Sequence, residues 1–334
     1  MTPHESPTAD VGFAGCSALI TGGLGFIGSH VARRLVGLGA RVTVVDSLIP
    51  EYGGNLQNIS DIAGQLRINV SDVRDPHSFR SLLAGQDYLF NLAGQTSHQD
   101  SMDNPFTDLE INCTAQLSIL EACRQYNPGI RIVFASTRQI YGRPDYLPVD
   151  ERHPLRPVDV NGINKLAGEN YHQLYQQVYD IPTCALRLTN TYGPAMRIKD
   201  ARQTFLGIWI RRLLEDEPFE VWGGAQLRDF NYVDDVVDAL LLAIRHPNAE
   251  GKVFNLGSPE VVSLTALAQQ LVAAHGRGGF SIRDFPAERK KIDIGDYYSD
   301  YRALAALGWQ PQVSLASGLT RTLAYFREHL EHYR

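Results

Sequence analysis

The run from Thr21 to Gly28, which reads TGGLGFIG, constrains what this chain can fold into more than any other segment. Apolar residues at 18–20 precede it, and a helical periodicity over 27–36 follows it. Glycines at this spacing let the backbone approach a pyrophosphate, and the unpaired amides of the following helix, at the positive end of its dipole, favour that negative charge. The pattern predicts a buried strand, a tight turn and a helix that together bind a dinucleotide.

Asp46 supplies a second signal at the end of the next apolar run, 41–45. A carboxylate about twenty residues after the glycines accepts both hydroxyls of an adenosine ribose. It also repels a 2′-phosphate, and the neighbouring Ser47 and Leu48 offer no guanidinium that could bind one. The expected cofactor is therefore NAD rather than NADP.

Strand-like and helix-like segments continue to alternate along the chain. Strands are predicted at 66–70, 88–92, 131–135, 183–188, 219–222 and 252–256, and helices at about 108–126, 163–179 and 204–215. Such alternation indicates a parallel sheet with helices on both faces. The expected fold is α/β, a Rossmann-type doubly wound parallel sheet with a smaller, interleaved C-terminal substrate lobe.

This reading divides the chain into three parts. Residues 1–13 are polar and lack an apolar stretch, so they are expected to be a disordered tail rather than a signal peptide. Residues 14–190 are expected to form the NAD-binding domain, to which segments at about 225–260 return. Residues 191–334 are expected to form mainly the substrate-binding lobe.

Composition excludes several classes of function. The 31 basic and 37 acidic side chains give a net charge of −6, without the basic stripe of a nucleic-acid-binding protein. No segment approaches the roughly twenty apolar residues of a membrane span. The 4 cysteines and 10 histidines lack metal-ligand spacing, so we expect no metal site, and reduced thiols in a cytoplasmic protein.

Further motifs are spread over nearly the whole chain. Besides TGGLGFIG, they are DSL at 46–48, DVR at 72–74, NLAG at 91–94, ST at 136–137, YG at 141–142, NKLAGE at 164–169, RLTNTYGP at 187–194, RDF at 228–230, YVDD at 232–235, FNLG at 254–257 and LGWQP at 307–311. Together they resemble the extended short-chain dehydrogenase/reductase family, particularly its UDP-glucose 4-epimerase-like nucleotide-sugar epimerases and dehydratases. The resemblance implies NAD as cofactor and a nucleotide sugar as substrate.

The resemblance also implies which residues touch the two ligands. NAD contacts are expected from Gly22, Gly25, Phe26, Ile27, Gly28, Asp46, Ser47, Asn55, Asp72, Val73, Leu92, Ala93, Gly94, Gln95, Asn112 and Lys165. Substrate contacts are expected from His98, Arg138, Asn190, Gln203 and Arg228, and from Arg289 or Lys290.

One catalytic position departs from the family's pattern. The resemblance places a hydroxyl that polarises the sugar oxygen at Thr137, and a cation that holds the nicotinamide ribose at Lys165. Family members carry the base, a tyrosine, four residues before that lysine, so that both project from one helix face. Here that position is Asn161, and an amide cannot act as a general base near neutral pH.

Several groups could take the proton instead. The candidates are Lys165, whose pKa the positive nicotinamide ring would lower; Tyr141, four residues after Thr137; His98; and a water held by Thr137 and Asn161. A reaction that needs only a weaker base, and a protein that binds NAD and a nucleotide sugar without turnover, stay open as well.

The pair Arg138-Gln139 favours one reaction over others. Dehydratases and decarboxylases of the family commonly carry acids after the Ser or Thr, to remove a C5 proton or to handle a carboxylate. We therefore expect NAD-dependent epimerisation of a nucleotide-activated sugar, at C4 through a transient keto intermediate, with dehydration or decarboxylation as the alternative. An inward-facing Arg138 would suit an acidic or unusually hydroxylated sugar, because a guanidinium favours bidentate contact.

The predicted helices at 108–126 and 163–179 look two-sided. Their outer apolar residues could contact a second copy of the chain, so we expect a homodimer, although the same residues could equally face their own sheet. The candidates are Leu117, Leu120, Leu166 and Tyr175.

Overall fold

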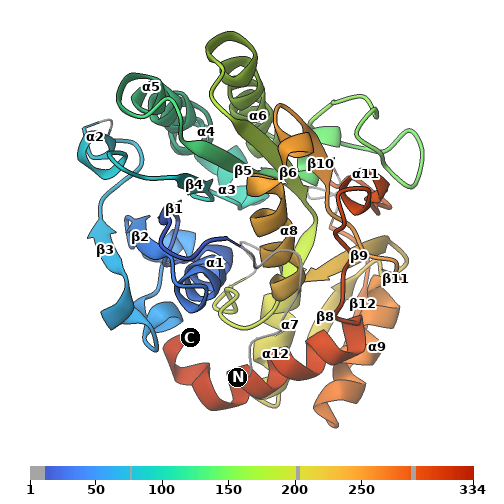
Figure 1. Cartoon of the computed structure of the whole chain (residues 1–334). Coiled ribbons are helices and arrows are strands. Elements are labelled where there is room, and N and C mark those ends of the chain that lie inside the picture. The colour runs from blue at the N-terminus through green and yellow to red at the C-terminus, as the bar shows by residue number, and fades with distance from the viewer. Residues whose placement is uncertain (1–11, 76, 201–203, 287–290) are drawn as a thin grey trace.

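A parallel sheet forms the centre of the molecule in the computed structural model, which describes residues 12–75, 77–200, 204–286 and 291–334 (Figure 1). Within these residues the sheet has 7 strands. From edge to edge they are β10 (Val253–Asn255), β6 (Thr183–Leu188), β5 (Arg131–Thr137), β4 (Tyr88–Asn91), β1 (Ser17–Thr21), β2 (Arg41–Asp46) and β3 (Arg67–Val70). Because β1 lies between β2 and β4, the chain winds outward in both directions, as the sequence predicts.

Helices cover both faces of this sheet (Figure 1). One face carries α1 (Phe26–Gly37) and α8 (Val233–Arg245), and the other carries α5 (Ala115–Tyr126) and α6 (Val160–Tyr179). Leu19 and Ile20 are neighbours on β1, and they belong to the two different cores because successive strand side chains point to opposite faces. Shorter helices are α2 (Phe79–Leu82), α3 (His98–Asp103), α4 (Pro105–Leu109) and α11 (Arg302–Ala305). None of the helices in the described residues is long and apolar enough to cross a membrane.

A smaller lobe is built from later segments and has its own apolar core. Its strands are β7 (Asn190–Tyr192), β9 (Leu227–Tyr232) and β11 (Val261–Ser263) in one sheet, and β8 (Phe219–Trp222) with β12 (Phe280–Arg283) in another. Its helices are α7 (Phe205–Leu214), α9 (Leu264–His275) and α12 (Leu315–His329). The chain leaves this lobe between β9 and β11, where α8 and β10 join the central sheet, so the two parts are interleaved.

The structure moves two boundaries that the sequence suggested. Phe13 was assigned to the tail, but its side chain is 0% exposed and packs on Tyr88, with ring centroids 5.3 Å apart. The folded part therefore includes Phe13, while residues 1–11 lie outside the described residues. The helix expected at 108–126 is divided, because a π-helical turn at Glu110–Thr114 separates α4 from α5.

The apolar residues proposed for contact with a second copy face their own domain instead. Leu120 and Tyr175 are buried in the core beneath α5 and α6. Leu117 and Leu166 are partly buried against neighbouring apolar clusters. Other apolar side chains form the outer surface of these helices.

Candidate active site

A cleft runs along the carboxyl edge of the central sheet, where β1, β2, β4 and β5 end. The residues that line it come from segments far apart in the chain. Those that the sequence singled out are Gly22, Gly25, Phe26, Ile27, Gly28, Asp46, Ser47, Asp72, Val73, Leu92, Ala93, Gly94, His98, Thr137, Arg138, Asn161, Lys165 and Asn190. Most of the expected ligand contacts are thus brought together.

The glycine turn joins β1 to α1 and packs closely against the start of the helix. Gly22 has a φ of +67°, in the left-handed region that favours glycine. A Cβ on Gly28 would lie 2.1 Å from the carbonyl oxygen of Gly22, so the first turn of α1 packs directly on the turn's backbone. Gly25 begins α1 without a side-chain cap, and the first turn of α1 holds no acidic residue. The amides and positive dipole end of α1 therefore stay available to an anion.

Asp46 lies at the end of β2, beside this turn. Its carboxylate accepts hydrogen bonds from the backbone amides of Leu24 and Leu48, each at 3.0 Å. Burial raises the pKa of Asp46, and the two backbone donors oppose that rise. These bonds fix the carboxylate in the wall of the cleft, where it fits the expected contact with a ribose.

Lys165 lies on α6 at the far side of the cleft and is 6% exposed. Its Nζ donates a hydrogen bond to the carbonyl oxygen of Ala135 at 2.7 Å. Burial lowers its pKa to about 8, against the opposing attraction of Asp108 and Glu169. A Cβ on Gly94 would lie 3.2 Å from Nζ, so the amine rests against the backbone of the cleft floor.

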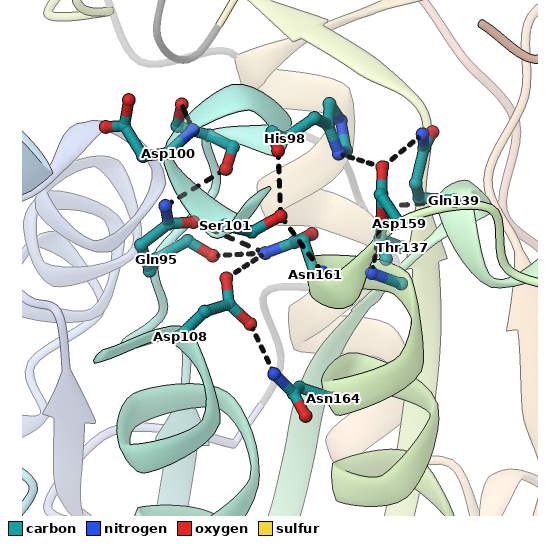
Figure 2. A network of polar contacts seen from close by, with 12 residues as sticks. Gln95, His98, Asp100, Ser101, Asp108, Thr137, Gln139, Asp159, Asn161 and Asn164 are labelled. Carbon is teal, nitrogen blue, oxygen red and sulfur yellow. Dashed lines mark hydrogen bonds and ion pairs between the residues drawn. The ribbon is translucent and has the colours of Figure 1, made fainter. Parts of the chain in front are cut away.

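Asn161, one turn before Lys165 on α6, belongs to a buried polar network (Figure 2). Its side-chain nitrogen donates to the carbonyl oxygen of Gln95 at 2.8 Å and to Oδ2 of Asp108 at 2.9 Å. Asn164 donates to Oδ1 of Asp108 at 2.8 Å. Asp108 is only 1% exposed, so the two amides supply the donors that a buried carboxylate requires.

A second network reaches the cleft through His98 (Figure 2). Its Nδ1 lies 3.0 Å from Oδ2 of Asp159, whose side chain is 0% exposed. Asp159 caps α6 by accepting from the amide of Gly162 at 2.7 Å, and it also accepts from Nε2 of Gln139 at 2.9 Å. Burial alone would raise the pKa of Asp159, but the bonds from His98, Gly162 and Gln139 lower it below its ordinary value.

Thr137 ends β5 and Arg138 follows it, and both line the cleft. The Thr137 hydroxyl accepts a hydrogen bond from the amide of Gln139 at 3.2 Å. Arg138 donates to Oδ1 of Asn190 at 3.2 Å, and its guanidinium carbon lies 5.2 Å from the centroid of the Tyr297 ring. Burial lowers the pKa of Arg138. Arg138 is therefore part of the cleft wall rather than a solvated surface arginine.

Tyr141 is placed away from the cleft, which contradicts its candidacy as the base. Its ring is 0% exposed, its hydroxyl donates to Oδ1 of Asn255 at 2.7 Å, and it accepts from Nη1 of Arg187 at 2.6 Å. Arg187 in turn forms a buried ion pair with Glu169 at 2.6 Å. Burial raises the pKa of Tyr141 to about 12. This tyrosine forms buried hydrogen bonds in the protein interior and does not line the cleft.

Arg228, expected to hold a substrate phosphate, is also bonded within the protein. It is 6% exposed and donates to the carbonyl oxygens of Leu227, at 2.8 Å, and Gly295. Its Nη2 lies 3.6 Å from Asp293, and burial lowers its pKa to about 10. Arg228 does not line the cleft that holds Thr137 and Lys165.

Three cofactor candidates lie behind or beside the lining. Asn55 caps the short 3-10 turn Leu56–Ile59 and donates to the carbonyl oxygen of His332 at 3.0 Å. Gln95 and Asn112 are buried behind Gly94, where Asn112 donates to the carbonyl oxygen of Gln95 at 2.9 Å. The substrate candidates Gln203, Arg289 and Lys290 lie outside the described residues.

Sequence reasoning missed part of the site. Asp159 carried a usable signal, because an acid three residues before a helical amide is a typical N-cap. Asp108 carried none, since its contact with Asn161 joins residues far apart in the chain. Further lining residues, which the sequence analysis does not name as ligand contacts, are Val45, Ile49, Tyr52, Thr96, Ile111, Ala135, Ser136, Gln139, Leu188, Thr189, Thr191, Met196 and Thr204.

The cleft is suited to a dinucleotide rather than to a metal. In the part of the chain that the structure describes, no group of three or more His, Cys, Asp or Glu side chains could hold a metal ion. At one end of the cleft, the glycine turn lies beside the uncapped start of α1 and the carboxylate of Asp46. At the other end lie Lys165 and Thr137.

Comparison with known proteins identifies the family. The model of the NAD dependent epimerase/dehydratase family matches residues 18–257. The putative UDP-glucose 4-epimerase of Methanocaldococcus jannaschii is 33% identical over 315 residues, covering 93% of this chain and 98% of that protein. UDP-glucuronic acid decarboxylase 1 of Xenopus tropicalis is 33% identical over 327 residues, covering 94% and 73%. The solved UDP-glucose 4-epimerase of Thermotoga maritima, with UDP-glucose, has a TM-score of 0.85 and 30% identity, covering 94% and 99%.

Gly28→Ala is expected to weaken NAD binding by about tenfold or more, close to 1.4 kcal/mol, because the added methyl group must push α1 away from Gly22. Isothermal titration calorimetry measures the affinity. Gly37→Ala is the matched control, since a Cβ at this last residue of the same helix meets no atom within 4 Å. Equal affinity in the two variants would contradict the role given to the glycine turn.

Lys165→Met is expected to stabilise the ligand-free protein at pH 7, by about 1–2 kcal/mol, because it removes a buried ammonium. The native pKa of about 8 lies below the ordinary 10.5, so between these values the unfolded chain binds the proton that the native protein has released. Wild-type stability therefore gains from Lys165 as the pH rises from 8 to 10.5, and the advantage of the variant shrinks there. Urea unfolding at several pH values tests this, with the exposed Lys252→Met as control; a constant difference would refute it.

Proposed function

The chain belongs to the NAD dependent epimerase/dehydratase family, and on that premise we propose that it epimerises a nucleotide-activated sugar at C4 through a transient keto sugar. The observation that carries the proposal is one continuous cleft that joins the glycine turn and Asp46 to Thr137 and Lys165. NAD⁺, when bound, would supply a hydride acceptor, and its reduced form would supply the hydride for the other face of the sugar, which inverts the centre.

The residues of the cleft divide into two groups by the part of the ligands they suit. The glycine turn and the start of α1 suit a pyrophosphate, and Asp46 suits the adenosine ribose. Lys165 suits the ribose next to the nicotinamide, since its amine projects from α6 toward the cleft floor at Gly94. The Thr137 hydroxyl suits the sugar oxygen that changes between alcohol and ketone.

The residues after Thr137 support epimerisation rather than elimination. Removal of a C5 proton needs a carboxylate or another base close to the sugar. In the described part of the cleft, the lining carboxylates are Asp46, which ends β2, and Asp72, which follows β3, and both lie on the side of the glycine turn. Gln139 is committed to Asp159 through its side-chain amide. The similarity to a decarboxylase makes loss of carbon dioxide the reaction to exclude by experiment.

The function is tested by incubating the NAD-loaded protein with UDP-, dTDP-, GDP-, CDP- and ADP-sugars. We expect one of them to be converted to its C4 epimer, identified by NMR, without a lasting absorbance of NADH at about 340 nm. A 4-keto product would indicate a dehydratase, and release of carbon dioxide from a uronic acid a decarboxylase. Binding without conversion across the panel would replace the proposal with a binding protein.

We also infer that two copies of the chain form a homodimer through the outer surface of α4, α5 and α6, which lie together at one end of the molecule (Figure 1). Large apolar side chains are exposed there: Phe106 (74%), Tyr126 (43%), Leu174 (47%) and Val178 (57%). Val178→Glu is expected to shift the sedimentation coefficient from dimer to monomer, whereas Ile282→Glu, at a 55% exposed position on β12, is expected to leave it unchanged. A monomeric wild-type protein would contradict the inference.

The four cysteines are free, and Cys123 and Cys184 are buried. Burial raises the pKa of both thiols to about 12, so they are unreactive core residues. Free thiols of this kind suit a reducing compartment, which supports a cytoplasmic location. Fractionation of the native host tests it, and recovery of the protein outside the cytoplasm would contradict it.

A further inference from the structure

We propose that His98, oriented by Asp159, is the general base and acid of this reaction, in place of the tyrosine that the chain lacks at position 161. The inference rests on the proposed function. The two residues come from separate segments: His98 begins α3 after β4, and Asp159 caps α6. Their side chains meet beside the cleft that also holds Thr137 (Figure 2).

Asn161 cannot serve as the base, because its amide is committed elsewhere. The side-chain nitrogen points away from His98, toward Gln95 and Asp108 (Figure 2). Its hydrogen bonds fix the side chain within the packed interior between α3, α4 and α6. An amide also has no basic lone pair near neutral pH. The proton must therefore be taken by a group at another position.

The acidic groups that line the described cleft lie at the end that suits adenosine, away from Thr137 at the end of β5. Asp46 ends β2 beside the glycine turn. Tyr52 lies in the short turn that follows β2, and Asp72 follows β3. Asp72 also forms an ion pair with Arg74 at 2.6 Å. These groups surround the part of the cleft that suits adenosine, remote from the end of β5.

Of the groups near the end of β5, only the imidazole combines a lone pair with a fixed orientation. Arg138 stays protonated and has no acceptor atom. Lys165 directs Nζ to the carbonyl oxygen of Ala135 and is the cation expected to hold a ribose. Among the described lining residues on this side, His98 is the one that carries an imidazole.

The contact with Asp159 determines which nitrogen of His98 is free. Nδ1 lies 3.0 Å from the Asp159 carboxylate, and an anion at that distance favours the tautomer with its proton on Nδ1. Nε2 is then unprotonated. The side chain of His98 is 37% exposed and lines the cleft, whereas that of Asp159 is 0% exposed and is not among the lining residues. In our proposal Nε2, the nitrogen that is not paired with Asp159, is therefore the one that faces the cleft.

The carboxylate is itself held rigidly. Its second oxygen accepts from the amide of Gly162 at 2.7 Å, and the first also accepts from Gln139 at 2.9 Å. The amide of Gln139 donates to the hydroxyl of Thr137 at 3.2 Å, so one network joins His98 to Thr137 (Figure 2). Gln139 thus has a structural role, because its two hydrogen bonds connect the carboxylate that orients the proposed base to the hydroxyl proposed to contact the sugar oxygen.

The proton and electron balance closes without a further reactant. Nε2 of His98 accepts the hydroxyl proton of the sugar while the hydrogen on the same carbon leaves with its electron pair for NAD⁺, and the C–O bond becomes C=O. On reversal the carbonyl carbon regains the hydride on its other face, and Nε2 returns the proton to the oxygen. Asp159 stays ionised throughout and stabilises the imidazolium, as a positioning residue.

The first test compares variants on the nucleotide sugar that the wild-type protein converts. His98→Gln is expected to lower kcat by about 100-fold or more with little change in KM, and Asp159→Asn by about tenfold or more. Asparagine keeps an oxygen for the cap of α6, so the helix start is preserved. The exposed His77→Gln is the control and is expected to retain wild-type kcat. Added imidazole should restore part of the rate of His98→Ala, but not that of Lys165→Met.

The second test needs no cofactor. Nitrogen-15 NMR of the imidazoles in the ligand-free protein is expected to show His98 with its proton on Nδ1, assigned by the loss of its signals in His98→Gln. Asp159→Asn is expected to abolish that preference, whereas His77→Gln leaves it intact. A wild-type His98 protonated on Nε2 would overturn the assignment of the base.

The two proposals fail in different ways. If the wild-type protein converts a sugar and His98→Gln does so at the same kcat, the role of His98 is refuted while the proposed function stands. If His98→Gln is inactive but imidazole fails to rescue folded His98→Ala, the residue has a structural role only and the inference is refuted. If the wild-type protein converts no sugar, the proposed function fails, and the catalytic role of His98 fails with it.

Discussion

The contact between the start of α1 and the turn after β1 is the constraint on which the rest of the site depends. Only a hydrogen at Gly28 lets the helix approach the Gly22 carbonyl, because a Cβ would lie 2.1 Å from that oxygen. This approach sets the direction of α1 and leaves its N-terminal amides open at the edge of the sheet. The neighbouring parallel strands end at the same edge of the sheet. Asp46, Gly94 and Thr137 therefore lie in one cleft because each is at or just after the end of a strand.

Asn161 cannot be considered apart from Asp108 and Asn164, because both amides donate to the same buried carboxylate. The amide binds Asp108, and Asn164 binds the other oxygen of the same carboxylate. A buried carboxylate that loses one of its donors is costly, since its remaining partner cannot compensate for the lost solvation. Position 161 therefore cannot regain a phenol by a single substitution without leaving Asp108 short of a donor. The asparagine, its partner acid and the neighbouring amide behave as one unit.

Features that depend on residues close together in the sequence could be predicted, whereas contacts between distant segments could not. The strands and α1 were predictable because apolar runs and glycine spacing are local, and the cleft followed because parallel strands end at one edge. Tyr141 was misjudged because the chain turns sharply after β5, through a 3-10 turn at Arg138–Tyr141, and buries the ring beside Arg187. The pairing of Asp108 with Asn161 joins distant segments, so no local pattern encodes it.

Two of the partners of Asp159 have different roles in the structure: the amide of Gly162 lies in the first turn of a helix, and the ring of His98 lines the cleft. Fraying of the first turn of α6 would release the carboxylate, and the imidazole would lose its orientation in the same event. Local order and chemical competence are thereby coupled through a single side chain. Hydrogen exchange at the Gly162 amide would then follow the fraction of molecules ready to react, which makes one backbone proton a reporter for the state of the whole centre.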